Sequence, residues 1–172
     1  GVLTEDYLQP KYGALSHDAE TLFIASNVFP TIQLVAEIQL LTAEHGLSFS
    51  DKFIAFKTTI KVPNIASFKS ISPNLRFTSS IVAAQFLESP SAIFKYNGQE
   101  IENDFKLLTA GRVSKTLSPT NTLIGPADKL FIEEDAIVEA SILNTNTGYI
   151  YIGLEAEIME NCAVRGPLAL CE

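Results

Sequence analysis

Two histidines with acidic neighbours are the residues of this chain best suited to proton transfer. His17 precedes Asp18, and His45 follows Glu44. A histidine beside a carboxylate can serve as a general base. Both fall beside predicted helix ends or loops, where a solvated loop residue is the alternative interpretation. A cupin-like metal site needs two or three histidines and a carboxylate that converge, and two histidines on opposite sides of a strand are too few for it.

Acidic residues gather in the second half of the chain and could offer oxygen ligands or paired carboxylates. The cluster Glu133–Asp135 has oxygen donors of the kind that Ca²⁺ prefers, but it lacks the spacing of an EF-hand loop. The alternative is an exposed turn that keeps a strand edge from pairing. The carboxylates of Glu155, Glu157 and Glu160 are too close in sequence to flank a sugar, and the chain has no Trp for stacking. We therefore predict neither a metal nor a catalytic pair of carboxylates.

The remaining motif search also finds no catalytic signature. There is no G-x-S-x-G elbow, no phosphate-binding G-x-x-x-x-G-K-[ST] loop and no G-x-G-x-x-G fingerprint. Gly111-Arg112 is a lone turn. Four lysines form either a loose basic stripe or a solvated face: Lys52, Lys57, Lys61 and Lys69. On this basis we predict that the chain is not an enzyme and uses no cofactor.

Composition excludes several classes of protein. The chain has 172 residues, a net charge of -8, 47% hydrophobic and 19% charged residues. This balance is typical of a folded domain and not of a disordered chain. No cluster of Lys and Arg suggests nucleic-acid binding, and no apolar run is long enough to cross a membrane. Cys162 and Cys171 are either free thiols of a reducing compartment or a bridge that closes a short loop.

Alternation of apolar and polar residues predicts strands in the first half of the chain. Residues 52–62 alternate clearly. Residues 32–41 also alternate, and we favour a strand there, although Leu, Ala, Glu and Gln would equally suit a helix. A short helix is predicted over 17–27, with Ser16 as its N-cap. Asn97-Gly98 predicts a type I′ turn between two hairpin strands.

The second half predicts a sandwich that closes with a long hairpin. Residues 129–143 and 149–159 form its two strands, joined by the loop Asn144–Gly148. No repeat at a fixed period is apparent. We therefore predict an all-β fold, an antiparallel β-sandwich or jelly roll with at most one or two short helices. It comprises an extended N-terminal arm (1–15), a single domain (16–160) and an irregular C-terminal tail (161–172).

Residues 116–158 show a sequence of features that has a parallel in a known class of protein. A Pro-containing approach at Ser118-Pro119 leads to the polar turn Glu133–Asp135, and a strand then enters the loop Asn144–Thr147. The last strand carries the pattern Ile152-Gly153-Leu154-Glu155. This order resembles the closing half of small jelly-roll virion proteins of bacteriophages. The resemblance implies a capsid, cement or head–tail accessory subunit, located in the virion and built for assembly without catalysis.

The expected partners are copies of the same chain or other virion proteins, with no nucleic acid and no membrane. Residues expected at subunit contacts are Tyr7, Tyr12, Asn144, Thr145, Asn146, Tyr149 and Tyr151. Two alternatives remain open. One is a lectin- or adhesin-like module, cytoplasmic or secreted, that binds carbohydrate or peptide through Tyr149 and Tyr151. The other is a small β-barrel enzyme with His17 or His45 as its base.

Overall fold

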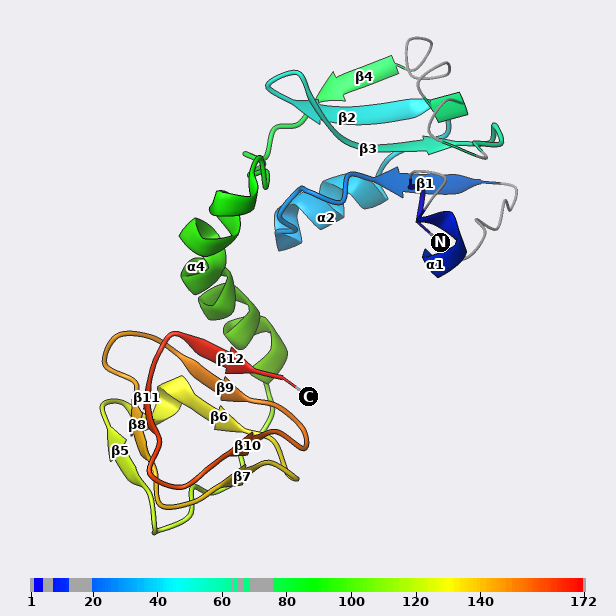
Figure 1. The fold of residues 1–172 in the computed structure, drawn as a ribbon. Helices are drawn as coiled ribbons and strands as arrows, with labels where there is room; N and C mark the ends of the chain where they lie inside the picture. Colours follow the sequence, from blue (N-terminus) through cyan, green and yellow to red (C-terminus); the bar gives the residue numbers. More distant parts are fainter. Residues whose placement is uncertain are drawn as a thin grey trace. The chain divides into compact units, whose positions relative to one another are not determined.

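The chain divides into two compact units in a computed structural model (Figure 1). The structure describes residues 2–4, 8–12, 20–62, 64, 67–68 and 76–171. The first unit comprises residues 1–88 and the second residues 89–172. The predicted single domain, residues 16–160, includes parts of both units. The predicted extended arm, residues 1–15, is described at 2–4 and 8–12, where Gln9–Tyr12 form a short helix. We describe each unit by itself.

The first unit contains a four-stranded mixed sheet. Its strands are β1 (Thr21–Ile24), β2 (His45–Phe49), β3 (Lys52–Thr58) and β4 (Arg76–Ser79), and its helices include α1 (Gln9–Tyr12) and α2 (Ile32–Gln39). The strand order is β1-β3-β2-β4. Strand β3 is antiparallel to both β1 and β2, whereas β2 and β4 are parallel. The strand predicted from residue 52 is confirmed as β3.

Two apolar clusters form the core of the first unit. Leu34 and Ile38 of α2 pack with Leu47 of β2 and with Ile54 and Ala55 of β3. The second cluster is aromatic, and its members are Phe23, Phe53, Phe56 and Phe68, with Val62 and Leu3. The ring centroids of Phe23 and Phe56 lie 4.9 Å apart in a stacked arrangement. The sheet is therefore held by apolar residues on both of its faces.

The strand predicted over 32–41 is wrong, because residues 32–39 form helix α2. The Thr31 side chain accepts a hydrogen bond from the Leu34 amide and caps the helix. Only Leu34 and Ile38, one helical turn apart, are buried, while Ile32 and Leu40 on the same alternating set are exposed. Burial thus follows a period of four residues and not of two.

The helix predicted over 17–27 is also wrong where the structure describes it, since Thr21–Ile24 is strand β1. Residues 17–19 lie outside the described residues. Strand β1 pairs with β3 along its length, from Thr21 opposite Thr58 to Ile24 opposite Ala55. Pairing with β3 therefore overrides a weak helical pattern of only three turns.

The second unit is a coil of short parallel strands that follows one long helix (Figure 1). The helix is α4 (Pro90–Thr109). The strands are β5 (Thr122–Ile124), β6 (Leu130–Ile132), β7 (Ile137–Val138), β8 (Ile142–Asn144), β9 (Ile150–Ile152), β10 (Glu157–Ile158), β11 (Ala163–Arg165) and β12 (Leu168–Leu170), with a 3₁₀ turn at Ala127–Lys129. They form three parallel sheets of order β11-β8-β5, β12-β9-β6 and β10-β7.

Each strand of this coil pairs with the strand one turn later in the chain. Thr122 of β5 is opposite Ile142 of β8, and Leu130 of β6 is opposite Ile150 of β9, so the pairing repeats roughly every 20 residues. This arrangement is a parallel β-helix. The predicted antiparallel jelly roll and closing hairpin are therefore not confirmed, and the prediction that no repeat exists is wrong.

Aliphatic side chains fill the interior of the coil. The buried set is Leu130, Ile132, Ala136, Val138, Leu143, Ile150, Ile152, Ala156 and Ile158. The inward face predicted for the last strand is confirmed for Ile150, Ile152, Ala156 and Ile158, whereas Leu154 is exposed. The tail predicted to be irregular carries β11 and β12, whose Val164, Leu168 and Leu170 pack against the same core.

The hairpin predicted at Asn97-Gly98 is wrong, because both residues lie inside helix α4. Pro90 stands in the first turn, where its missing N–H costs nothing. Phe105 is buried with its ring centroid 4.6 Å from that of Tyr149 on the coil. A Cβ atom on Gly98 would lie 3.2 Å from Cγ of Pro167, so glycine permits a close approach of helix and coil. Contact with the coil thus explains a helix where local turn chemistry predicted a turn.

None of the helices in the described segments is both long enough and apolar enough to cross a membrane.

Candidate functional site

Three side chains that can carry positive charge lie in one row across the sheet of the first unit. His45 of β2 is opposite Lys57 of β3 on one side and opposite Arg76 of β4 on the other. Residues directly opposite each other on neighbouring strands project from the same face of a sheet. We call His45, Lys57 and Arg76 the basic row. His45 and Lys57 are half-buried, and Arg76 is exposed.

Hydrogen bonds near the start of β2 orient the His45 ring. Its Nδ1 lies 3.0 Å from the Ala43 carbonyl oxygen and 3.0 Å from the Thr42 hydroxyl. A carbonyl oxygen only accepts, so Nδ1 carries the hydrogen that it donates there.

The carboxylate of Glu44 is hydrogen-bonded to the end of β3. Its oxygens accept hydrogen bonds from the Thr59 amide at 2.9 Å and from the hydroxyls of Thr58 and Thr59, each at 2.9 Å. The Thr59 amide is the main cause that lowers the pKa of Glu44, and the two hydroxyls add to it. Glu44 has a φ of 61°, a left-handed conformation that is uncommon outside glycine. This turn directs the side chain toward Thr58 and Thr59.

Lys57 has an acidic partner in the described structure. Its Nζ lies 3.0 Å from a carboxylate oxygen of Glu20, just before β1. The Lys57 side chain is only 24% exposed, and that of Glu20 is 47% exposed. The pair therefore joins a half-buried cation to a carboxylate that solvent reaches easily.

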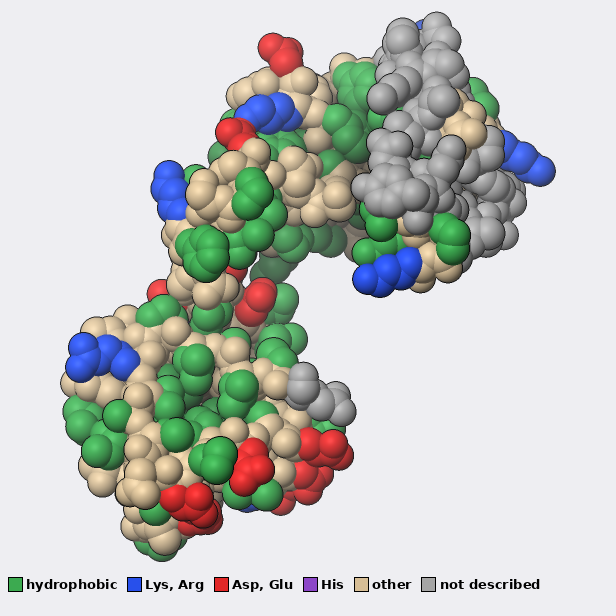
Figure 2. Space-filling view, viewed as in Figure 1, with side chains coloured by type: hydrophobic (Ala, Val, Ile, Leu, Met, Phe, Trp, Pro, Cys, Tyr) green, Lys and Arg blue, Asp and Glu red, His purple; other side chains and the backbone are tan. Residues whose placement is uncertain are grey.

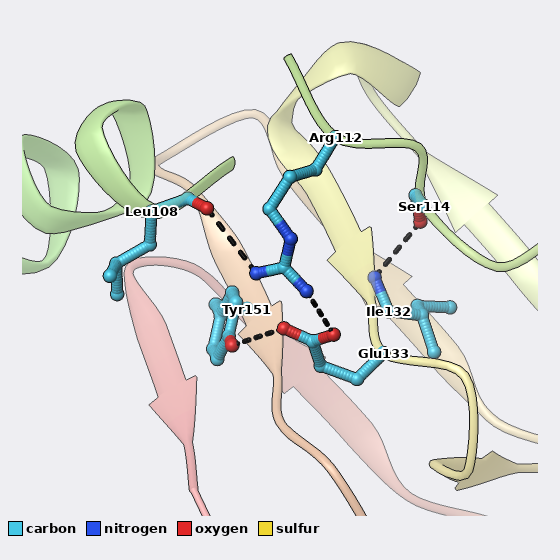
Figure 3. A network of polar contacts seen from close by, with 6 residues as sticks. All are labelled: Leu108, Arg112, Ser114, Ile132, Glu133 and Tyr151. Carbon is cyan, nitrogen blue, oxygen red and sulfur yellow. Dashed lines mark hydrogen bonds and ion pairs between the residues drawn. The ribbon is translucent and has the colours of Figure 1, made fainter. Parts of the chain in front are cut away.

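A second polar network lies in the second unit, where the chain leaves helix α4 (Figure 3). Arg112 Nη2 lies 2.5 Å from Oε2 of Glu133, and Arg112 Nη1 donates to the Leu108 carbonyl at 3.3 Å. The Tyr151 hydroxyl donates to Oε1 of Glu133 at 2.5 Å. The Arg112 guanidinium also lies 5.1 Å from the centre of the Phe131 ring. These contacts fasten the end of α4 to β6 and β9.

The same contacts shift the pKa values of their members. Arg112 is the main cause that lowers the pKa of Glu133, and the Tyr151 hydroxyl lowers it further. The carboxylate of Glu133 in turn raises the pKa of Tyr151. Glu133 is therefore ionised and Tyr151 is neutral across the physiological range of pH.

We expect Glu133→Gln to weaken the acid sensitivity of the second unit. A carboxyl whose pKa is lowered by folding stabilises the fold above its unfolded pKa of about 4.3, and this stabilisation is lost as the pH falls through the lower folded value. Wild-type protein should therefore lose more thermal stability than E133Q when the pH is lowered from 7 to 3. Glu134→Gln is the matched control, because Glu134 is the exposed neighbour in the same turn. Equal losses in wild type and E133Q would contradict the assignment.

The residues predicted as subunit contacts are scattered over the structure. Tyr7 lies outside the described residues, and Tyr12 is exposed at the end of α1. Thr145 is fully buried at a corner of the coil and donates to the Pro126 carbonyl at 2.8 Å. Tyr149 packs against α4, as described above. No partner chain is present, so contacts between subunits stay predictions.

The other predicted site residues take several positions. The oxygen of the Asn144 side chain accepts from the Asn146 amide at 3.0 Å, which shapes the corner after β8. His17 lies outside the described residues, while His45 belongs to the basic row. Among the described residues, no group of three or more His, Cys, Asp or Glu side chains could hold a metal ion. Cys162 and Cys171 are free thiols.

Comparison with known families settles the class of the chain. A family model described as sugar nucleotidyl transferase matches residues 1–113. The chain belongs to the sugar nucleotidyl transferase family. The match includes the basic row and helix α4, and it ends at the residue after Arg112. Searches of curated proteins and of solved structures return no match.

Membership of this family corrects the function predicted from the sequence. The predicted virion structural protein is wrong, and so is the prediction that the chain is not an enzyme, because the family is one of transferases. The resemblance to jelly-roll virion proteins is not confirmed by any family match. The motif search missed the basic row because its three members are far apart in the sequence and meet only through strand register. Of the three, only His45 and Lys57 belong to features that are recognisable in the sequence.

Proposed function

We propose that the protein transfers a nucleotidyl group from a nucleoside triphosphate to a sugar phosphate. In this reaction an oxygen of the sugar phosphate attacks the α-phosphorus of the triphosphate. The bond between that phosphorus and the oxygen bridging to the β-phosphate breaks, and pyrophosphate leaves with the electron pair. The products are a nucleotide sugar and pyrophosphate, so atoms and charge balance without a redox partner.

The observation that carries this proposal is the family match over residues 1–113. The charge distribution supports it. The whole chain has only 12 Lys and Arg against 20 Asp and Glu, yet the matched segment aligns two cations and a histidine on one sheet face. Both substrates and both products carry phosphate groups, which cationic side chains bind and position. Positioning and charge stabilisation supply most of the catalysis in phosphoryl transfer.

The test is formation of a nucleotide sugar by the full-length protein. The protein is supplied with Mg²⁺, one nucleoside triphosphate at a time and a panel of sugar 1-phosphates. Pyrophosphate release is followed continuously, and the nucleotide sugar is identified by mass spectrometry. We expect pyrophosphate only when both substrates are present. Release that is independent of the sugar phosphate, or no nucleotide sugar with any pair of substrates, would overturn the proposal.

A further inference from the structure

We propose that the basic row is a phosphate-binding surface and that the Glu20 carboxylate pairs with Lys57 until a phosphate group displaces it. The proposal rests on the proposed nucleotidyl transfer for the source of the phosphate, which is a nucleotide or a sugar phosphate. The binding itself follows from the geometry of the first unit and can be measured without turnover.

Strand register fixes the spacing of the row. Neighbouring strands lie about 4.8 Å apart, so the Cα atoms of Lys57, His45 and Arg76 span roughly 10 Å across three strands. The side chains of Lys and Arg are long enough to converge from the two ends of such a span on one group above the central histidine. A phosphate offers several acceptor oxygens, which suits cationic side chains that approach from different strands.

Burial strengthens the Lys57 end of this surface. Lys57 is largely screened from solvent, and a partly desolvated ammonium interacts with an anion more strongly than one in bulk water. His45 lies between Lys57 and Arg76, and the hydrogen bond from its Nδ1 to the Ala43 carbonyl fixes the position of the ring in the row.

The acidic side chains near the row differ in how firmly they are held. Glu44 accepts hydrogen bonds from the Thr59 amide and from two hydroxyls, and these contacts keep its carboxylate at the end of β3. Within the described part of the chain, Glu20 has one ion pair, to Lys57, and its side chain is nearly half exposed. A phosphate group carries more charge than a carboxylate, and the half-exposed Glu20 side chain can turn into solvent when it is displaced. Glu20 is therefore the group that a phosphate can displace.

The test compares two Lys–Glu pairs of the same unit. Lys57 pairs with Glu20, while Lys52, at the other end of β3, pairs with Glu88. Binding of inorganic phosphate, a sugar 1-phosphate and a nucleoside triphosphate is measured by isothermal titration calorimetry on the full-length protein. The variants are Lys57→Met, Arg76→Met and Glu20→Gln, and the matched controls are Lys52→Met and Glu88→Gln. Circular dichroism checks that each variant is folded.

Substitution of Lys57 and substitution of Glu20 should change the affinity for the phosphate ligand in opposite directions. Lys57→Met and Arg76→Met should each weaken the affinity for the phosphate ligand about tenfold or more, as expected for a lost charge-assisted hydrogen bond. Glu20→Gln should tighten it about threefold to tenfold, because the competing carboxylate is gone. Lys52→Met and Glu88→Gln should stay within about twofold of wild type. If Glu20→Gln behaves like Glu88→Gln, or Lys57→Met like Lys52→Met, the proposal is wrong.

Failure of this inference can be told apart from failure of the proposed function. If wild-type protein releases pyrophosphate but Lys57→Met and Arg76→Met bind both substrates as wild type does, the row is not the phosphate site and the activity stands. If the row variants alter binding but no nucleotide sugar forms, the row stands and the proposed transfer does not. The ligand whose affinity responds to Glu20→Gln identifies whether nucleotide or sugar phosphate occupies the row, and either response supports the inference.

Discussion

Ile152→Asp is expected to unfold the coil of the second unit. Ile152 is fully buried between the neighbouring strands of its sheet, opposite Ile132 of β6 and Leu170 of β12. An aspartate there would place a carboxyl group among aliphatic side chains with no hydrogen-bond partner provided. Burial of such a group costs about 4 kcal/mol or more, which is a large part of the stability of a domain of this size.

Amide hydrogen exchange over β6, β9 and β12 measures this effect directly. We expect exchange in these strands to approach that of an unfolded chain in I152D. Leu154→Asp is the matched control, because Leu154 stands two residues later on the same coil but is 47% exposed. The control should leave exchange almost unchanged. Protection of β9 in I152D at the wild-type level would place Ile152 outside the core and contradict the parallel coil.

Phe56→Ala is expected to have the largest effect on the first unit. Phe56 is fully buried in β3, and its ring contacts those of Phe23, Phe53 and Phe68. Alanine would remove the ring at the centre of this aromatic cluster and leave a cavity. Truncation of a buried phenylalanine costs about 3–5 kcal/mol, because lost burial and the cavity both contribute.

Urea denaturation measures the stability of the first unit, and amide hydrogen exchange in β2 and β3 reports the unfolding of its sheet. Phe94→Ala provides the comparison, since Phe94 is 87% exposed on α4. We expect F56A to shift the unfolding midpoint strongly downward and F94A to leave it within experimental error. Equal midpoints for F56A and wild type would mean that the aromatic cluster does not hold the sheet.

The position of the basic row on β2, β3 and β4 links the Phe56→Ala prediction to function. Loss of Phe56 acts on the opposite face of β3 from Lys57, its neighbour in the chain, because successive side chains of a strand alternate between faces. Gly46 lies beside His45 on β2, and the Phe77 ring covers the space where a Cβ atom would stand. The aromatic face thus supports the backbone whose other face presents the row.

Part of the fold could be predicted from local patterns. Alternation identified β3, and it identified the inward residues Ile150, Ile152, Ala156 and Ile158. The inward residues of the coil could be predicted because the burial of alternate residues is a property of a single strand and needs no knowledge of its partner. In β3 the consecutive residues Ile54, Ala55 and Phe56 are all buried, since both faces of the sheet are covered. The same reasoning failed for α2, where an alternating sequence also satisfies a helix with Leu34 and Ile38 inward.

The candidate site could be predicted only in fragments. His45 is recognisable as one of two histidines beside an acidic residue, and Lys57 only as one of four lysines in a loose stripe. No motif or pattern in the sequence includes Arg76, and its strand pairs with β2 in parallel after a long connection. No motif joins these residues because no single loop or turn contains them. The network of Arg112, Glu133 and Tyr151 was missed for the same reason, since each member comes from a different segment.

By itself, the sequence determined that this chain is acidic, rich in short apolar strands, and built with Ile152 and its neighbours facing inward. Only the tertiary structure decided that these strands pair in parallel as a coil, that residues 90–109 form a helix, and that the basic row exists. The physical reason is the same in each case. The pattern within a strand is identical whether its neighbour runs parallel or antiparallel, and only register brings distant residues to one face.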